Sequence, residues 1–242
     1  MKTKIINGKP FDKALVALPK DFTVGSMRTN ALARIQAGKD ADISQNGNYT
    51  REGWVYTPNT EGAYLVRDSP ILDNPTEATE AHRNGNEFYL GKEFTLENGI
   101  LVPYNQKPIH TNRFGEEEIT SFIFEDQAEA YGQFLKEAGI DEMPVYLIGK
   151  NHVDRQKQQF ARQNWFNGLG VRSGLNGSYR SLNYNIGVFG VLASDEVAMP
   201  QKISDKYERF ISELEGLPED LRNTIAHYAI KNPSKLKNLG NL

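Results

Sequence analysis

The sequence contains no cysteine, and this absence excludes several kinds of chemistry at once. A chain without thiols has no disulfide framework, no thiolate metal site and no cysteine nucleophile. No apolar run approaches the roughly 18 residues that a membrane helix needs. The stretch MKTKIINGKPFDKALVALPKDF interrupts its apolar residues with Lys, Asp and Pro, so it lacks the apolar core of a secretion signal. We therefore expect a soluble protein, cytoplasmic or associated with a virion, without membrane insertion.

An excess of charge of one sign is also missing. The chain has 28 Lys and Arg against 31 Asp and Glu, and its net charge of -3 gives no general attraction to nucleic acid or anionic membranes. Residues 155–194, however, contain no acidic residue and five basic ones: Arg155, Lys157, Arg162, Arg172 and Arg180. Two interpretations stay open. The guanidinium groups either fasten loops by bonding carbonyls and carboxylates, or form a local site for an anionic ligand.

Motifs of catalysis and metal binding are absent as well. The four histidines, His82, His110, His152 and His227, do not occur at metal-ligand spacing, so we expect them to be structural or at the surface. The glycine-rich run NGLGVRSGLNG lacks the Lys-Ser/Thr of a phosphate loop and the GxGxxG spacing of a dinucleotide site. No GxSxG nucleophile motif occurs. The sequence therefore predicts no metal, no cofactor and no catalytic residue.

The first half of the chain is punctuated by turn-forming clusters. Residues 1 to about 100 are expected to be loop-rich and poor in strands, apart from strand-like runs at 54–56 and 63–66. A helix is predicted near 31–37, with Asn30 as its candidate N-cap and Gly38 closing it.

Helical patterning becomes clearer from residue 119. The run ITSFIFEDQAEAYGQFLKEAGI has apolar residues at helical spacing and predicts one helix ending at Gly139. The run MPVYLIGK, residues 143–150, predicts a buried strand. After Pro200, two amphipathic helices separated at EGLPED are expected. We therefore predict one domain over residues 1–196 and a helical appendage over 197–242.

The stretch QNWFNGLGVRSGLNGSYRSLNYNIGVFGV, residues 163–191, is unlike the rest of the chain. We expect its spaced apolar residues to form a buried skeleton: Trp165, Phe166, Leu169, Val171, Leu175, Leu182, Val188 and Val191. Arg172 and Ser173 lie between these residues, and Gly177, Gly187 and Gly190 are expected at turns. The residues between these points are nearly all Asn, Ser, Gly and Tyr, which form helices and strands poorly. Recognition surfaces favour the same residues. Because a loop on a rigid scaffold commonly carries function, a binding surface is favoured over a catalytic pocket.

Residues 152–192, HVDRQKQQFARQNWFNGLGVRSGLNGSYRSLNYNIGVFGVL, resemble the variable region of proteins diversified by diversity-generating retroelements, of the type found in archaea and their viruses. In that family a reverse transcriptase copies a template with errors at adenines, which turns Asn codons into codons for Tyr, Ser, Gly and others. The resemblance implies a C-type lectin fold of the formylglycine-generating-enzyme subtype. The expected fold class is therefore α+β, loop-rich with short antiparallel strands, followed by C-terminal helices.

The chain departs from this family in two respects. The variable region often lies near the C-terminus in the family, whereas about 50 residues follow it here. The catalytic relatives on this fold depend on cysteines, which this chain lacks, so the resemblance implies a binding protein and not an enzyme.

The composition and the resemblance together predict a variable ligand-binding surface over about residues 164–189. Its residues would be Asn164, Asn167, Gly168, Gly170, Gly174, Asn176, Ser178, Tyr179, Ser181, Asn183, Tyr184, Asn185 and Phe189. Tyr179 and Tyr184 would be the anchors, because aromatic residues tend to carry the energy of such interfaces. The expected partner is a protein or a glycan, with nucleic acid disfavoured.

Two alternatives of other classes stay open. One is an enzyme on the same fold that acts on an anionic substrate through Arg172, Arg180 and a carboxylate from the first half of the chain. The other is a nucleic-acid-binding protein that uses the basic residues of 155–194, with Tyr179 and Tyr184 stacking on bases.

Overall fold

The computed structural model describes residues 1–91, 99–178, 182 and 186–197. The chain divides into two compact units, residues 1–196 and 197–242, and the description below concerns the first. The two helices predicted after Pro200 lie outside the described residues.

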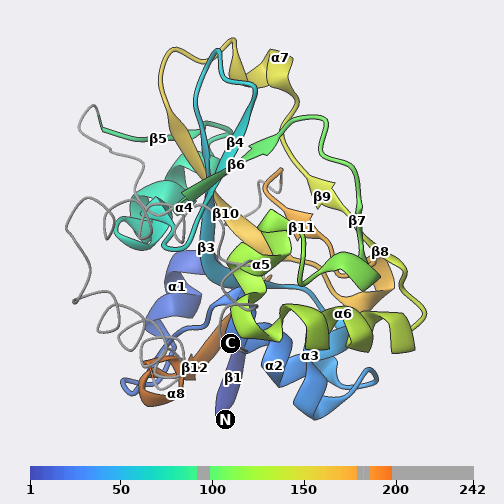
Figure 1. The fold of residues 1–242 in the computed structure, drawn as a ribbon. Coiled ribbons are helices and arrows are strands. Elements are labelled where there is room, and N and C mark those ends of the chain that lie inside the picture. Colours follow the sequence, from blue (N-terminus) through green and yellow to red (C-terminus); the bar gives the residue numbers. More distant parts are fainter. Residues whose placement is uncertain (92–98, 179–181, 183–185, 198–242) are drawn as a thin grey trace, which may run out of the picture. The chain divides into compact units, whose positions relative to one another are not determined.

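A ten-stranded mixed sheet forms the centre of this first unit (Figure 1). Its main path runs β1 (Thr3–Lys9), β12 (Ile186–Leu192), β3 (Asn48–Tyr56), β10 (Phe160–Phe166), β11 (Leu175–Asn176) and β9 (Val145–Tyr146). Off this path, β2 (Phe22–Val24) pairs with β12, β4 (Gly62–Val66) with β3, β6 (Gly99–Pro103) with β4 and β5 (Phe88–Tyr89) with β10. The pairs β12–β3 and β11–β9 are parallel, and the others are antiparallel. A second, two-stranded sheet joins β7 (Ile109–His110) and β8 (Glu142–Met143).

Short helices surround the sheet. The α-helices are α1 (Phe11–Val16), α2 (Met27–Ala37), α3 (Asp42–Gln45), α4 (Pro75–Arg83), α5 (Glu118–Phe124), α6 (Ala128–Glu137), α7 (Lys150–Val153) and α8 (Ala193–Val197). The 3-10 turns are η1 (Pro70–Leu72), η2 (Thr111–Arg113), η3 (Glu125–Gln127) and η4 (Leu169–Val171).

Three local predictions need correction. The helix predicted from residue 119 is two helices, because Glu125 has a φ of 53° and breaks α5 from α6. The cap of α2 is Ser26, whose Oγ accepts from the Thr29 amide, and not Asn30. The single buried strand predicted at 143–150 is divided by Pro144 into the ends of β8 and β9, and Tyr146 is exposed.

The prediction that residues 1–100 are poor in strands is also wrong. This part of the chain contributes β1 to β5 and the start of β6, including the nine-residue central strand β3. Both faces of β3 are covered by side chains, so its sequence NYTREGWVY does not show the apolar and polar alternation of a half-exposed strand.

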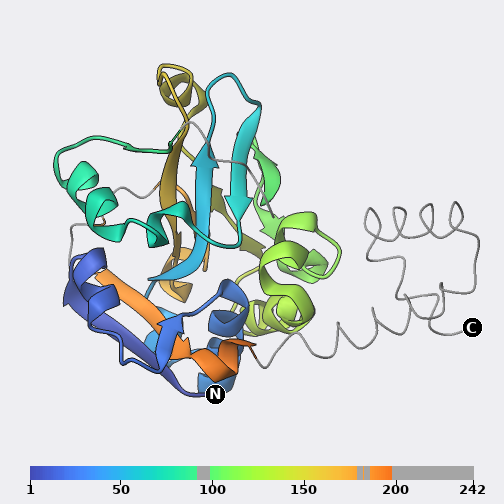
Figure 2. The same cartoon turned by 90° about the vertical axis from the view of Figure 1, so that its left-hand side faces the viewer.

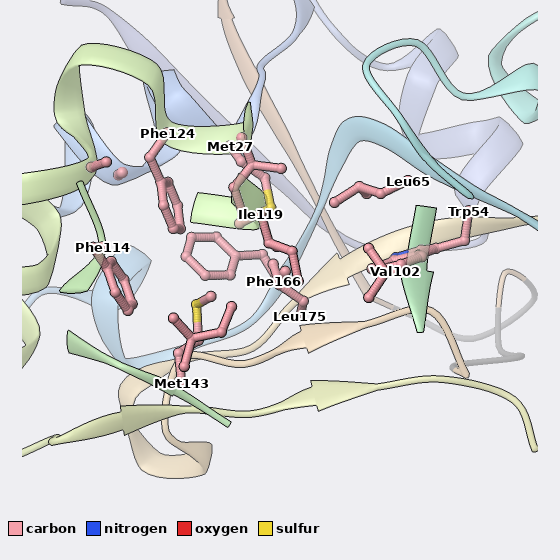
Figure 3. Packing of buried hydrophobic residues seen from close by; sticks show 14 of the residues in the cluster. Met27, Trp54, Leu65, Val102, Phe114, Ile119, Phe124, Met143, Phe166 and Leu175 are labelled. Carbon is pink, nitrogen blue, oxygen red and sulfur yellow. The ribbon is translucent and has the colours of Figure 1, made fainter. Parts of the chain in front are cut away.

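Alternate residues of the central strands enter two different cores, as the two-residue period of a strand requires. Trp54 and Tyr56 of β3 pack with α2, α5 and α6, whereas Val55 packs with α1 and α4. Figure 2 shows α4 on one side of the sheet and α5 and α6 on the other. Phe166, at the end of β10, lies in the first core among Phe114, Phe124, Met143 and Leu175 (Figure 3). The segment that follows Phe166 therefore leaves the sheet from a firmly packed point.

Candidate functional site: a loop surface between β10 and β11

The loop of residues 167–174, which joins β10 to β11, is held from beneath by Arg34 of α2. The Arg34 side chain is fully buried, and its guanidinium carbon lies 3.9 Å from the centre of the Phe166 ring. Its two terminal nitrogens donate to four neutral oxygen atoms at 2.9 to 3.3 Å: the carbonyls of Asn46 and Asn167 and the hydroxyls of Tyr131 and Ser173. Buried hydrogen bonds of a charged donor are strong, so this residue fixes both ends of the loop to the core.

The loop turns sharply through two consecutive residues in the left-handed region. Arg172 and Ser173 have φ values of 60° and 50°, which cost a non-glycine residue of the order of 1 kcal/mol each. The turn is closed by the Ser173 amide bonding the Gly168 carbonyl at 3.0 Å and the Asn167 amide bonding the Gly174 carbonyl at 2.9 Å. The Ser173 hydroxyl lies 2.5 Å from that of Tyr131. These bonds give the loop one defined backbone path.

After the turn, β11 is fastened to β9 by main-chain bonds. The Leu175 amide donates to the Pro144 carbonyl and the Gly177 amide to the Tyr146 carbonyl, both at 2.9 Å. Gly177 has no room for a side chain, since an added Cβ would lie 2.6 Å from the Tyr56 hydroxyl. This position therefore requires glycine.

Most of the predicted apolar skeleton is buried. Phe166, Leu169, Leu175, Leu182, Val188 and Val191 are buried, and Trp165 is half-buried with its ring centre 4.9 Å from that of Tyr49. Val171, which was expected in the buried skeleton, is 55% exposed, and the side chain of Arg172, placed between the points of that skeleton, is also exposed. Val171 is the last residue of η4, and Arg172 is the first of the two left-handed residues that follow it.

Five of the residues predicted to vary at the surface are buried: Asn164, Asn167, Gly168, Gly174 and Phe189. The prediction that these five residues lie at the surface is therefore wrong. Asn164 belongs to the core, since its Oδ1 accepts from Trp54 Nε1 at 2.9 Å and its Nδ2 donates to Thr50 Oγ1 at 3.1 Å.

Close packing accounts for the other buried positions. A Cβ on Gly168 would collide with the Gln45 carbonyl, and one on Gly174 would lie 2.8 Å from Pro144. The side chain of Asn167 is buried beside its anchored carbonyl, and the Phe189 ring fills the space beside Gly25. Sequence alone gave no sign of these contacts, because their partners are distant in the chain.

Three of the predicted residues do reach the surface. Gly170 and Ser178 are exposed and Asn176 is half-exposed; the Asn176 Oδ1 accepts from the amide and hydroxyl of Ser178 at 3.0 and 2.8 Å. Tyr179, Ser181, Asn183, Tyr184 and Asn185 lie outside the described residues. The structure adds Tyr146, Val171 and Arg172 as exposed neighbours, and we define the loop surface as residues 170–172, Asn176, Ser178 and Tyr146.

Comparison with known proteins bears on the fold. No family model and no curated protein matches the chain. It is similar to a solved structure that concerns the accommodation of massive sequence variation in Nanoarchaeota by the C-type lectin fold, with 17% identity and a TM-score of 0.53 over 78% of this chain and 94% of that chain. This chain has a C-type lectin fold. The α+β class predicted from the sequence is confirmed.

A groove opens beside the loop surface of this C-type lectin fold. It has a volume of about 400 Å³ and is lined by His110, residues 139–142 and Arg172. His110 Nδ1 lies 3.4 Å from Glu142 across the β7–β8 pair. The groove is thus lined by one basic residue, Arg172, and two acidic residues, Asp141 and Glu142.

Not every basic side chain of residues 155–194 reaches the surface. Arg162 is buried and bonds both oxygens of Glu87, with its Nε at 2.7 Å and its Nη2 at 2.6 Å. His152 Nε2 lies 3.1 Å from the same carboxylate, as the structural interpretation of this histidine expects. Arg155, Lys157 and Arg172 are exposed, and Arg180 lies outside the described residues. For Arg162, the interpretation that a guanidinium fastens the fold is confirmed.

Within the described ranges, no helix is long and apolar enough to cross a membrane. The same part of the chain contains no cluster of three or more His, Cys, Asp or Glu residues that could hold a metal ion.

The two asparagines of the loop region allow a matched test of which positions tolerate change. Asn164→Ser is expected to lower the free energy of unfolding by about 2–3 kcal/mol, because it leaves the buried Trp54 Nε1 without its acceptor. Asn176→Ser, at a half-exposed position, should cost less than about 1 kcal/mol. Urea unfolding of both variants measures the difference, and equal losses would contradict the division into buried and displayed positions.

Glu52 of β3 is a titratable group that contacts the start of α2, the helix that carries Arg34. Both carboxylate oxygens of the buried Glu52 accept from the Met27 amide, at 2.9 and 3.1 Å. Burial raises the pKa of Glu52 to about 7. The folded protein then binds a proton more tightly than the unfolded chain does, so stability falls as the pH rises from about 4.5 to 7.

Glu52→Gln should remove this dependence. At pH 8 the variant is expected to be more stable than the wild type by up to about 3 kcal/mol, and at pH 4.5 the two should be similar. Thermal unfolding across this pH range provides the measurement, with Glu80→Gln, at an exposed site on α4, as the control that keeps the wild-type slope. A wild-type slope in the Glu52 variant would show that Glu52 does not titrate in this range.

Proposed function

We propose that the protein binds ligands through the loop surface, and that a diversity-generating retroelement varies the residues displayed there. On this proposal the fold is of the formylglycine-generating-enzyme subtype and the protein acts by binding, not by catalysis. The observation that carries the proposal is a contrast within residues 167–178. The backbone of the loop is fastened by the buried Arg34 and Ser173, whereas Gly170 and Ser178 are exposed and Asn176 is half-exposed.

This contrast is the physical requirement for a surface that must change while the fold persists. Substitutions at exposed positions away from caps and cores usually alter stability by less than about 0.5 kcal/mol. The exposed residues also belong to the set that recognition surfaces use. Similarity to a structure concerned with massive sequence variation on the C-type lectin fold supports the same proposal.

The ligand we propose is a protein or a glycan. A nucleic-acid ligand is disfavoured because Arg162 is neutralised in the interior and the groove beside Arg172 carries Asp141 and Glu142. These carboxylates would repel a phosphate backbone.

Sequencing this gene and its flanking DNA from many individuals of one natural population tests the proposal. Differences should be concentrated at codons 170, 176, 178, 179, 181 and 183–185, and should map to adenines in a nearby template copy. Codons for the buried residues, Asn164 among them, should encode only residues that fit the packed interior. A population in which the exposed codons vary as little as that of Trp165 would overturn the proposed diversification.

A further inference from the structure

Tyr146 is a large aromatic residue at the loop surface, but it comes from outside the stretch predicted to vary. It lies on β9 (Figure 1), which pairs in parallel with β11, and its register partner is Asn176. Side chains of register partners on neighbouring strands point to the same face of a sheet. Tyr146 is 42% exposed, so it stands beside Asn176 on the face that a ligand would approach.

The Tyr146 ring is already held in place. It packs against the backbone of the loop, since a Cβ added to Gly174 would lie 3.1 Å from Tyr146 Cε2. Main-chain bonds on both sides of it, from Leu175 and Gly177, fix β9 against β11. An aromatic side chain ordered before binding loses little conformational entropy when a partner covers it.

The surroundings of Tyr146 carry charges of both signs. Arg172, two residues before Gly174, lines the 400 Å³ groove together with Asp141 and Glu142. None of the ion pairs found among the described residues involves Arg172. A folded protein presents acidic, basic and apolar groups on one surface and can match all three features, whereas a neutral glycan offers no charge to Arg172 or the carboxylates.

We propose that Tyr146 is a fixed anchor of the loop surface, which contacts a protein partner whichever residues occupy the varied positions. This inference rests on the proposed function. One rigid tyrosine contributes to the binding free energy with every partner that the site binds. The varied residues around it then decide which partner is bound.

A selection experiment on the full chain tests this inference. Codons 170, 176, 178, 179, 181 and 183–185 are randomised, the library is displayed on phage, and clones that bind streptavidin as the protein probe are isolated. Tyr146→Ala, Tyr146→Phe and Tyr89→Ala are then introduced into each clone. Tyr89 on β5 is a matched control because it is 40% exposed, close to the 42% of Tyr146, and lies outside the loop surface.

Tyr146→Ala is expected to weaken streptavidin binding about tenfold or more in most clones, while Tyr89→Ala changes it less than about twofold. Tyr146→Phe, which keeps the ring, should retain most of the affinity. Tyr146→Leu keeps apolar cover over Gly174 and replaces the Ala variant should that variant fail to fold. Clones that bind equally well without the Tyr146 ring would overturn the inference and leave the proposed function standing. A library that yields no streptavidin binder would overturn the proposed function and the inference with it.

Discussion

Arg34→Met is expected to lower the free energy of unfolding by about 3 kcal/mol or more. Methionine has a similar length but donates no hydrogen bond, so the buried Asn167 carbonyl and the buried hydroxyls of Tyr131 and Ser173 lose a charged donor. Each buried acceptor left unsatisfied costs about 1–3 kcal/mol. Urea unfolding gives the total loss, and limited proteolysis within residues 167–174 reports the release of the loop.

Gln36→Met is the matched control for this experiment. Gln36 is exposed on the same helix, α2, and its replacement should change stability by less than about 0.5 kcal/mol. Equal stability of the two variants, with a loop that stays resistant to protease, would show that Arg34 does not hold the loop.

Arg162→Met and Glu87→Gln are each expected to cost about 3–5 kcal/mol, because either change leaves the opposite charge in the interior without the two-bond ion pair that compensates it. Both side chains are 3% exposed, and two nitrogens of Arg162 bond the two oxygens of Glu87. The double variant should be more stable than the sum of the two losses predicts, since neither charge remains. Unfolding of the four proteins in a double-mutant cycle measures this coupling.

The pair of Arg113 and Glu117 provides the surface comparison. Its side chains are 54% and 33% exposed, and its Nη2–Oε1 distance is 2.8 Å. Arg113→Met should cost less than about 1 kcal/mol, because solvent already screens an exposed pair. If the buried pair proved no more important than this one, Arg162 would not fasten β10 as the structure indicates.

The sequence predicted the fold class, but only part of the candidate surface. Local patterns indicated helical structure from residue 119, though not its break at Glu125, and they identified most of the buried skeleton from Phe166 to Val191, because apolar spacing reports burial directly. They were insufficient for β3. Contacts on both of its faces conceal the alternation on which such a prediction depends.

Asn164 and Asn176 show why the surface itself could not be predicted residue by residue. The two are the same amino acid in the same region of the chain, yet one bonds Trp54 and Thr50 in the core and the other lies near solvent. The partners of Asn164 are more than a hundred residues away in sequence. Composition can therefore suggest a recognition stretch, but tertiary contacts decide which of its polar residues are displayed.

Tyr146 was missed for the opposite reason. Its run, MPVYLIGK, has the apolar character of a buried strand. Pro144 was the available signal: a proline cannot donate a ladder hydrogen bond, which places it at strand ends and at the edges of sheets. β9 is in fact the last strand on the main path of the sheet, where a side chain can remain partly exposed.

The pairing of β1 with β12 brings the two ends of the first unit together. Thr3 is in register with Val191, and the Lys2 amide donates to the Asp195 carboxylate at 2.8 Å. A domain whose entry and exit points adjoin can be spliced into a surface turn of another protein without stretching either backbone. Residues 1–196 therefore have the geometry of a domain that could be inserted into another protein in place of one of its surface loops.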